Sequence, residues 1–306
     1  MAGHEMRGLW VRDCRKFQGG KAFRARAMIH RNHKWLQTLQ QWVAASVVPM
    51  PLSRGSVPWL HSTLLADPRA REVGYRWITD RVYHTATPAS TNGNMADHMH
   101  MELVTSDTGS SLYIVGVERM YQTTFFGHFQ DVANCIWDAS IQHVHSDTSC
   151  VTTITPFSDD HTILYSRLHD TRLGTSMCVL TRRYDEPNRV VLATALLAND
   201  ECFPLQPAEL RPHGVAWTLV QRITDNVTLF RSESTQFAPR TTDGPMTLER
   251  NAAMCDVAVH PTTASITVAR IQESLVRNFV ARRQFMDKDI NDRLELRHDA
   301  AHTSTN

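Results

Sequence analysis

The segment that decides the fold is residues 215–237, which read VAWTLVQRITDNVTLFRSESTQF. Apolar residues recur at alternate positions in both halves of this segment. Because successive side chains of a strand point to opposite faces of a sheet, such a pattern predicts strands. Trp217 and Leu219 therefore share one face of the first half. Asp225-Asn226, between the halves, is a typical turn sequence and indicates antiparallel pairing. The two predicted strands are Val215–Ile223 and Val227–Phe237.

More strands are predicted upstream of this pair. Turn signals such as Leu173-Gly174 and Asp185–Asn188 separate short apolar or alternating runs. Connections of hairpin length favour antiparallel neighbours. The predicted strands are His98–Val104, Ser111–Arg119, His143–Thr155, Thr162–His169, Thr175–Tyr184 and Arg189–Ala198.

Helices are predicted on both sides of these strands. Asp67 followed by Pro68 is a favourable helix start, because Asp caps free amide groups and Pro fits the first turn. We expect this helix to run to about Tyr83. Apolar residues recur at helical spacing over Thr124–Asp138 and over Ser265–Phe285. The apolar face of the last helix includes Ile271, Leu275 and Phe279.

The order of these elements predicts an α+β helix-grip fold. In this fold a curved antiparallel β-sheet wraps around a long C-terminal α-helix, and here an N-terminal helical extension precedes it. A single helix covers the apolar face of such a sheet without filling the space beneath it, so a pocket remains. We expect a basic helical extension with a Pro-rich linker over residues 1–60, a ligand-binding domain over 61–298 and a disordered tail over 299–306.

Positive charge is concentrated near the N-terminus. The 306 residues have a formal net charge of +1 and are 42% hydrophobic, as in ordinary globular proteins. Residues 1–42, however, contain nine basic and two acidic residues, most of them in a helix predicted over residues 7–48. Two interpretations stay open: a solvated helix face, or a surface for an anionic partner such as nucleic acid, another protein or a lipid surface.

The six cysteines favour a reducing compartment. None belongs to a C-x-x-C pair, and several lie in apolar runs such as Met177-Cys178-Val179, as buried thiols do. The first 30 residues are basic and interrupted by glycine, unlike a secretory signal. The uncharged apolar runs are far shorter than the ~20 residues of a spanning helix. We therefore expect a cytoplasmic protein without a transmembrane segment, and the nucleus is the alternative location.

Three segments resemble the START family of lipid-binding domains. They are the run from Arg182 to Pro204, the strand pair Gly214–Ile223 and Val227–Pro239, and the C-terminal helix. The segment Ser62–Pro68 resembles a branch of START-like proteins in which a basic segment precedes the domain. The resemblance extends over residues 67–290, although Asp243–Thr263 has no counterpart. It implies binding of sterols, phospholipids or other lipids, and transient contact with a membrane surface.

A charged pair on the last predicted strand is the main candidate for ligand contact. Arg231 and Glu233 share one strand face with Val227 and Leu229. If this face looks into the pocket, the two charges must pair with each other or with polar groups of a ligand. A pair on the solvent side of the strand end is the alternative. The predicted ligand-binding residues are Val227, Leu229, Arg231, Glu233, Ile271, Leu275 and Phe279.

Sequence motifs of common catalytic sites are missing. The sequence contains no G-x-S-x-G, H-E-x-x-H, P-loop or G-x-G-x-x-G pattern. His98-x-His100 and His143-x-His145 each put two imidazoles on one side of a strand and can together ligate zinc. In a chain with 16 histidines, however, such pairs arise by chance. We therefore predict no metal, no cofactor and no catalytic residue.

The leading hypothesis is non-enzymatic binding of a lipid or another hydrophobic small molecule in an internal cavity, with coupling to regulation as a further step. The alternative is a regulatory or scaffold protein whose basic helix, residues 7–48, contacts a protein or nucleic-acid partner. A third hypothesis is a cyclase or hydrolase of the helix-grip superfamily, with Arg231, Glu233 and a histidine as acid–base groups. Ligand access is expected beside the C-terminal helix, near Asp243–Thr263.

Overall fold

A computed structural model describes residues 63–89, 96–107, 112–141, 149–154, 162–171 and 173–303. These residues belong to the second of two units into which the chain divides, Thr63–Asn306. The predictions for residues 1–60 lie outside the described residues. The helices and strands are β1 (Thr63–Leu64), α2 (Pro68–Ala89), β2 (His98–Asp107), β3 (Leu112–Phe126), α3 (Phe129–Ile141), β4 (Ser149–Ile154), β5 (Ile163–Asp170), β6 (Thr175–Glu186), β7 (Arg189–Leu196), β8 (Asn199–Asp200), β9 (Arg211–Thr224), β10 (Val227–Thr241), β11 (Gly244–Pro245), α4 (Leu248–Met254) and α5 (Ala264–Thr303).

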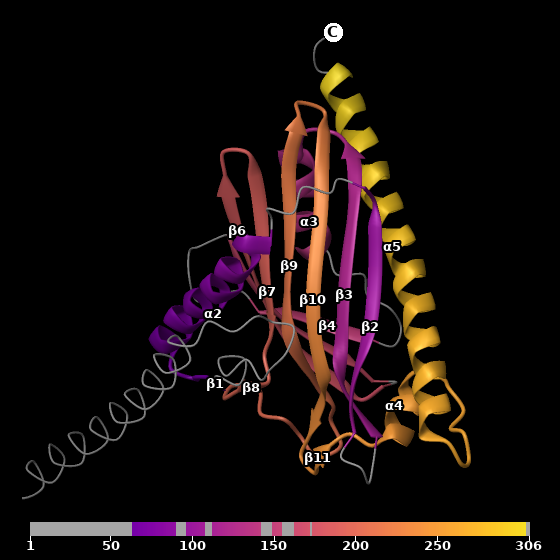
Figure 1. The fold of residues 1–306 in the computed structure, drawn as a ribbon. Helices are drawn as coiled ribbons and strands as arrows, with labels where there is room; N and C mark the ends of the chain where they lie inside the picture. Colours follow the sequence, from indigo (N-terminus) through magenta and orange to yellow (C-terminus); the bar gives the residue numbers. More distant parts are fainter. Residues whose placement is uncertain are drawn as a thin grey trace, which may run out of the picture. The chain divides into compact units, whose positions relative to one another are not determined.

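One antiparallel sheet holds nine of the described strands (Figure 1). Its order is β2-β3-β10-β9-β7-β6-β5-β4, and the short strand β11 pairs with β10. Strands β1 and β8 form a separate parallel pair. The segment 215–237 forms most of β9 and β10, which pair antiparallel as predicted. The two strands lie near the middle of the sheet. The other predicted strands correspond to β2 to β7, although β5 starts only at Ile163 and β7 ends at Leu196.

Helices cover both faces of this sheet. On β6, Arg182 and Tyr184 donate hydrogen bonds to Asp80 of α2 at 2.9 and 2.7 Å. Arg183, between them, donates to Asn134 of α3 at 2.7 Å. Because adjacent residues of a strand point to opposite faces, α2 and α3 lie on opposite sides of the sheet. Helix α5 packs beside α3, so the two sides are named the α2 face and the α5 face.

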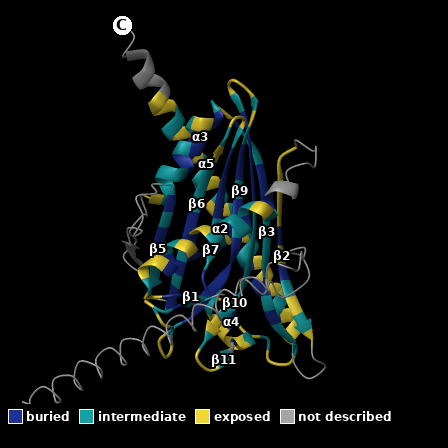
Figure 2. Cartoon of the chain, turned by 90° about the vertical axis from the view of Figure 1, so that its left-hand side faces the viewer, coloured by how far each residue is buried: buried dark blue, intermediate teal, exposed yellow. Residues whose placement is uncertain are grey.

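The main apolar core lies between the α5 face, α3 and α5. Figure 2 shows the central strands buried along most of their length. The core side chains include Phe125 of β3, Phe230 of β10 and Phe279 of α5. The helix after β3 was predicted to start at Thr124 and so to include Phe125, and this part of the prediction is wrong. The residue pairs with Thr228 in the β3–β10 ladder, and α3 starts only at Phe129.

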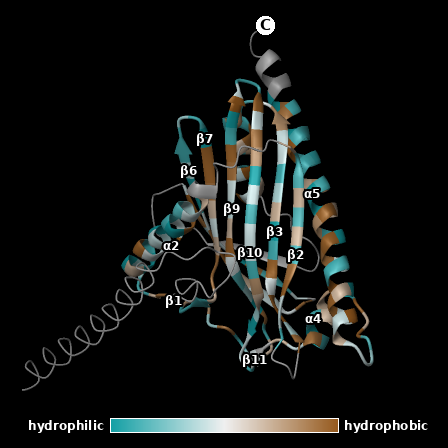
Figure 3. Ribbon diagram, viewed as in Figure 1, coloured by the Kyte–Doolittle hydropathy of each residue, from teal (hydrophilic) through white to brown (hydrophobic). Residues whose placement is uncertain are grey.

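Helix α5 is longer than predicted. It has 40 residues and continues beyond Phe285 to Thr303, into the segment expected to be a tail. Ile290 and Leu294 prolong its apolar stripe and pack on the core with α3, whereas Phe285 is 65% exposed. Figure 3 shows hydrophobic and hydrophilic residues alternating along the helix, as expected for an element that is covered on one side.

Helix α2 starts as predicted and ends later. The Asp67 carboxylate accepts the backbone N–H groups of Arg69 and Ala70 at 3.1 and 3.0 Å, which is the expected N-terminal cap. The helix then runs to Ala89, beyond the predicted end at Tyr83.

A buried ion pair fastens α2 to β8. Arg71 donates to both carboxylate oxygens of Asp200 at 2.8 Å, and the two residues are 1% and 3% exposed. The Tyr165 hydroxyl donates to the same carboxylate at 2.5 Å, and the Cys202 backbone N–H donates at 2.9 Å. Arg71 also donates to the Tyr75 hydroxyl at 3.0 Å. Every oxygen of the Asp200 carboxylate thus has two partners, which is what a buried carboxylate requires.

Candidate ligand-binding site

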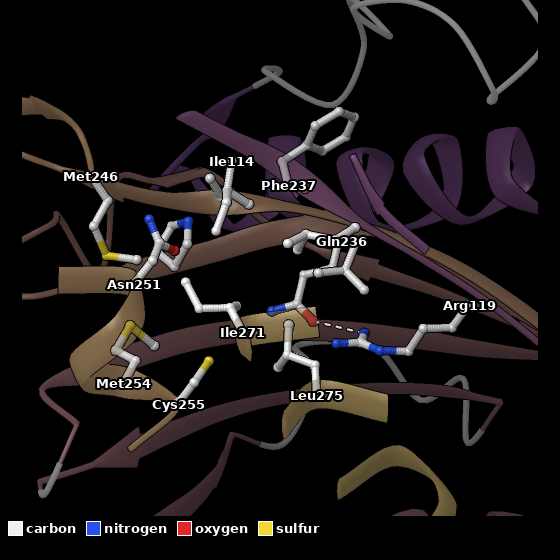
Figure 4. Close-up of a pocket in the computed structure, with 15 residues that line it drawn as sticks. Ile114, Arg119, Gln236, Phe237, Met246, Asn251, Met254, Cys255, Ile271 and Leu275 are labelled. Atoms are coloured by element: carbon white, nitrogen blue, oxygen red, sulfur yellow. Dashed lines mark hydrogen bonds between the residues drawn. The ribbon is translucent and has the colours of Figure 1, made fainter. Parts of the chain in front are cut away.

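A pocket of about 100 Å³ lies between the α5 face of the sheet and the helices α4 and α5 (Figure 4). Leu103 of β2 and Ile114 of β3 form one wall, and Ile271 and Leu275 of α5 face them. Leu103, Ile114 and Ile271 belong to one buried apolar cluster. The pocket is therefore a local gap in the contact between sheet and helix, as the helix-grip arrangement predicts.

Two features of the chain hold the pocket in shape. At Gly116 of β3 a Cβ atom would lie only 2.6 Å from the carbonyl oxygen of Gln236, so glycine allows β3 and β10 to approach closely here. On the other side, the Thr247 hydroxyl caps α4 by accepting the Arg250 N–H at 3.3 Å. The Ser274 hydroxyl of α5 then donates to the Cys255 carbonyl at 3.0 Å and ties the end of α4 to α5.

One end of the pocket is polar. Arg119 Nη1 of β3 donates to Gln236 Oε1 of β10 at 3.0 Å, as Figure 4 shows. Burial lowers the pKa of Arg119, and the positive charges of Arg282 and Arg283 lower it further. At the opposite end, burial raises the pKa of the Cys255 thiol, which keeps it protonated at neutral pH. The pocket is thus apolar with a cationic end.

The residues predicted on β10 lie on the wrong side of the sheet for this pocket. Four residues lie in one row across the neighbouring strands β10, β9, β7 and β6: Arg231, Leu219, Val191 and Tyr184. Tyr184 points to the α2 face. Directly paired residues share a face. The expectation that these side chains look toward the C-terminal helix is therefore wrong, because alternation shows which residues share a face but not which element covers it. The residues concerned are Val227, Leu229, Arg231 and Glu233.

On the α2 face, Arg231 and Glu233 have other surroundings than predicted. Arg231 Nε donates to Gln122 Oε1 at 2.7 Å. Burial raises the pKa of Glu233, Arg231 lowers it, and the carboxylate of Glu118 raises it again. This group therefore consists of the buried Arg231 and Gln122 and the half-buried Glu233 within the sheet, away from the apolar pocket.

The residues predicted on the final helix are close to the pocket. Ile271 and Leu275 line it. Phe279, one turn further along, belongs to the neighbouring core, where its ring centroid lies 5.6 Å from the Arg283 guanidinium carbon. Arg119 and Gln236 were missed. Their diagonal position on neighbouring strands of the α5 face follows only from the strand register, since neither has an apolar neighbour pattern that singles it out.

The histidine pairs that could ligate zinc are only partly described. The rings of His98 and His100 stack on β2 with centroids 6.4 Å apart. His143 and His145 lie outside the described residues. Within the described part of the chain, no three His, Cys, Asp or Glu side chains are grouped for a metal ion. The same part contains no helix with the length and hydropathy needed to cross a bilayer.

No protein-family model and no curated protein matches the sequence. Among solved structures, the chain is similar to human StAR-related lipid transfer protein 5, at 9% identity and a TM-score of 0.42 over 74% of this chain and 99% of that one. It is also similar to the Zhui aromatase/cyclase from Streptomyces sp. R1128, at 17% identity and a TM-score of 0.36 over 66% and 98% of the two chains. A StAR-related lipid transfer protein from Xanthomonas axonopodis matches at 12% identity and a TM-score of 0.32 over 58% and 98%. Identities and scores this low carry no conclusion about the function of this chain.

Proposed function

We propose that this unit binds the apolar part of a lipid or of another hydrophobic small molecule in the pocket beside α4 and α5, without catalysing a reaction. The lining supports this proposal: Leu103, Ile114, Ile271 and Leu275 face the gap with aliphatic side chains. Covering apolar surface with a ligand yields about 25 cal/mol per Å² before the costs of association are subtracted. An unfilled gap also loses the contacts that its lining would otherwise make.

The size of the pocket limits what it accepts. Its volume of about 100 Å³ is below the ~300–1,000 Å³ that encloses a complete drug-sized ligand. The pocket therefore takes one end of an acyl chain or a similar group. Beside Arg119, the paired residues Ser234, Ala216 and Thr194 form a row of small, partly exposed side chains across the α5 face. We propose that the remainder of the ligand lies along this row.

The composition of the lining supports binding over catalysis. Among the described residues that line the pocket, the polar side chains are those of Arg119, Gln236, Asn251 and Cys255. None of them is an acid or base that exchanges a proton near neutral pH in its ordinary state. Burial raises the pKa of Cys255 and so disfavours the reactive thiolate. This supports a binder rather than a cyclase or hydrolase.

The alternative of a regulatory or scaffold protein depends on the basic residues 1–42, which lie outside the described residues. A protein partner, a nucleic-acid partner and contact with a membrane surface all stay predictions. They are compatible with ligand binding, because a ligand that stabilises one arrangement of α5 would give such a protein its regulatory signal.

The test uses the purified full-length chain and two fluorescent probes, cis-parinaric acid and its uncharged methyl ester. Leu275→Trp fills the pocket, and Leu296→Trp is the matched control because Leu296 lies on the same helix and is 70% exposed. We expect Leu275→Trp to weaken probe binding by about tenfold or more, as loss of ~1.4 kcal/mol would, and Leu296→Trp to leave it unchanged. Circular dichroism checks that both variants are folded. If neither probe binds, or if both variants bind like wild type, the proposal is wrong.

A further inference from the structure

Two arginines from different elements meet on the α5 face beside the pocket. Arg119 pairs with Ser234 in the β3–β10 ladder and reaches Gln236 at 3.0 Å. Arg283 of α5 donates from Nη2 to the hydroxyl of Ser232 at 3.0 Å. Ser232 and Ser234 are on the same face of β10, two residues apart. The side chains of Arg119 and Arg283, which we call the arginine pair, therefore meet the α5 face at adjacent rows of the sheet, those of Ser234 and Ser232.

The arginine pair is held in place by neutral groups. The guanidinium carbon of Arg283 lies 4.9 Å from the ring centroid of Tyr121 and 5.8 Å from that of Phe230. These aromatic faces attract a cation without neutralising it. Each guanidinium donates a hydrogen bond to an uncharged side-chain oxygen and has further N–H groups for another acceptor.

The balance of charge around the arginine pair is positive. In the described part of the chain, neither arginine forms an ion pair with a carboxylate, whereas Arg71, Arg182 and Arg293 each pair with an aspartate. Asp287 acts on Arg283 electrostatically, but its carboxylate accepts the Tyr121 hydroxyl.

The pKa directions agree with this balance. Burial lowers the pKa of Arg283, and the opposite effect of Asp287 does not restore it. The pKa of Arg119 is lowered by burial and by the charges of Arg282 and Arg283. Two cations that are partly removed from water near each other cost free energy, and an anion placed between them relieves that cost. Guanidinium groups match the planar oxygens of carboxylates and the oxygens of phosphates in hydrogen-bond geometry.

We propose that Arg119 and Arg283 bind the acidic head of an amphiphile whose apolar chain enters the neighbouring pocket. This inference rests on the proposed function and narrows its ligand class to molecules that combine an apolar chain with a carboxylate or a phosphate. Neutral sterols and acylglycerols lack the group that the arginine pair accepts. Arg119 lines the pocket itself, so the acidic head group of the ligand can be attached to its apolar chain without a long spacer.

The experiment measures charge discrimination by the full-length chain at fixed ionic strength. Displacement of bound cis-parinaric acid is followed by fluorescence with two matched pairs of competitors. Oleate and methyl oleate differ by a carboxylate, and lysophosphatidic acid and monoacylglycerol with the same oleoyl chain differ by a phosphate. We expect the charged member of at least one pair to bind about tenfold more tightly than the neutral one, since charge-assisted hydrogen bonds are roughly twice as strong as neutral ones. The pair that shows the larger ratio identifies the head group.

Variants then assign the discrimination to the arginine pair. Arg119→Gln and Arg283→Gln should each reduce the charged-to-neutral ratio by about fivefold or more, and Arg119→Lys should retain part of it. Arg277→Gln is the control, because Arg277 is an exposed arginine on the same helix. Thermal unfolding checks that the variants are folded. The charged-to-neutral ratios of the wild-type chain test the inference even if a variant fails to fold. Equal binding of charged and neutral competitors by wild type overturns this inference while leaving the proposed function in place. A ratio that survives both glutamine variants overturns it as well.

Discussion

Replacing Asp200 by asparagine should destabilise this unit far more than the same kind of change at an exposed carboxylate. Asparagine has nearly the shape of aspartate, but it carries no charge and turns one acceptor oxygen into an NH₂ donor. Both oxygens accept from Arg71 in the folded protein, so that donor would face the guanidinium in either orientation, together with the Cys202 N–H or the Tyr165 hydroxyl. The buried Arg71 guanidinium would then lack its counter-ion.

The size of the effect follows from burial. Arg71 is 1% exposed, so solvent cannot replace the lost carboxylate. Burial acts to lower the pKa of Arg71, and the hydrogen bonds and charge of Asp200 outweigh this and raise it. Without Asp200 the arginine still keeps its proton at neutral pH, so a buried cation is left unpaired. Removing one partner of a buried ion pair costs about 3–5 kcal/mol.

The exposed pair of Arg76 and Glu72, at 3.2 Å with side chains 49% and 41% exposed, is the matched comparison. Glu72→Gln should cost about 0.3–0.5 kcal/mol.

Urea unfolding of the full-length chain, followed by Trp fluorescence and circular dichroism, measures both free energies by linear extrapolation. The double variant Arg71→Met/Asp200→Asn should be less destabilised than the sum of the single variants, because it no longer buries an unpaired charge. A cost below about 1 kcal/mol for Asp200→Asn, or strict additivity of the two changes, would show that the ion pair does not hold α2 to the sheet.

Two further changes test the register and the electrostatics of the sheet. Gly116→Ala puts a Cβ atom 2.6 Å from a backbone carbonyl oxygen and should cost about 1–3 kcal/mol in urea unfolding. Gly127→Ala, where the atom nearest to the new Cβ is a side-chain carbon at 3.5 Å, should stay within about 0.5 kcal/mol of wild type. Equal destabilisation by the two substitutions would refute the close approach of β3 and β10 at Gly116. Burial raises the pKa of Glu118 above its ordinary 4.5, and Glu102 across the ladder raises it further. The stability that protonated Glu118 contributes is therefore present below pH 4.5 and lost as pH rises through the folded pKa. Glu118→Gln should thus become stabilising relative to wild type as pH rises toward neutrality; a difference that is constant with pH would contradict this.

Strand positions were predictable because period-2 alternation and turn residues are local signals. The antiparallel pairing of β9 and β10, in which Thr218 lies opposite Ser232, follows from the two strands and the turn predicted within residues 215–237. Whether Arg231 or Ser232 looks toward α5 depends on which helix packs on which side of the sheet, and that is decided by contacts between distant parts of the chain. The prediction that Val227, Leu229, Arg231 and Glu233 share one face of the strand was right. The prediction that this face lines the pocket was not.

Helix boundaries were less predictable for similar reasons. Phe125 fits both a helical and a strand period, and its pairing with Thr228 decides for the strand. Helix α4 has only seven residues, too few for a periodic signal, although Thr247 is a typical cap. The end of α5 was placed too early because Phe285 faces solvent and interrupts the apolar stripe that Ile290 resumes.

The position of β10 beside β3 has a consequence for biosynthesis. The ladder from Phe126–Val227 to Gly116–Phe237 joins segments about 100 residues apart in the chain. At the ~5–20 residues per second of translation, the β2–β3 hairpin waits roughly 5–20 s for its partner strand to leave the ribosome. During this interval one backbone edge and the apolar side chains destined for α5 are open to other nascent chains. Chaperone capture of truncated chains ending before β10 is the natural place to look for this delay.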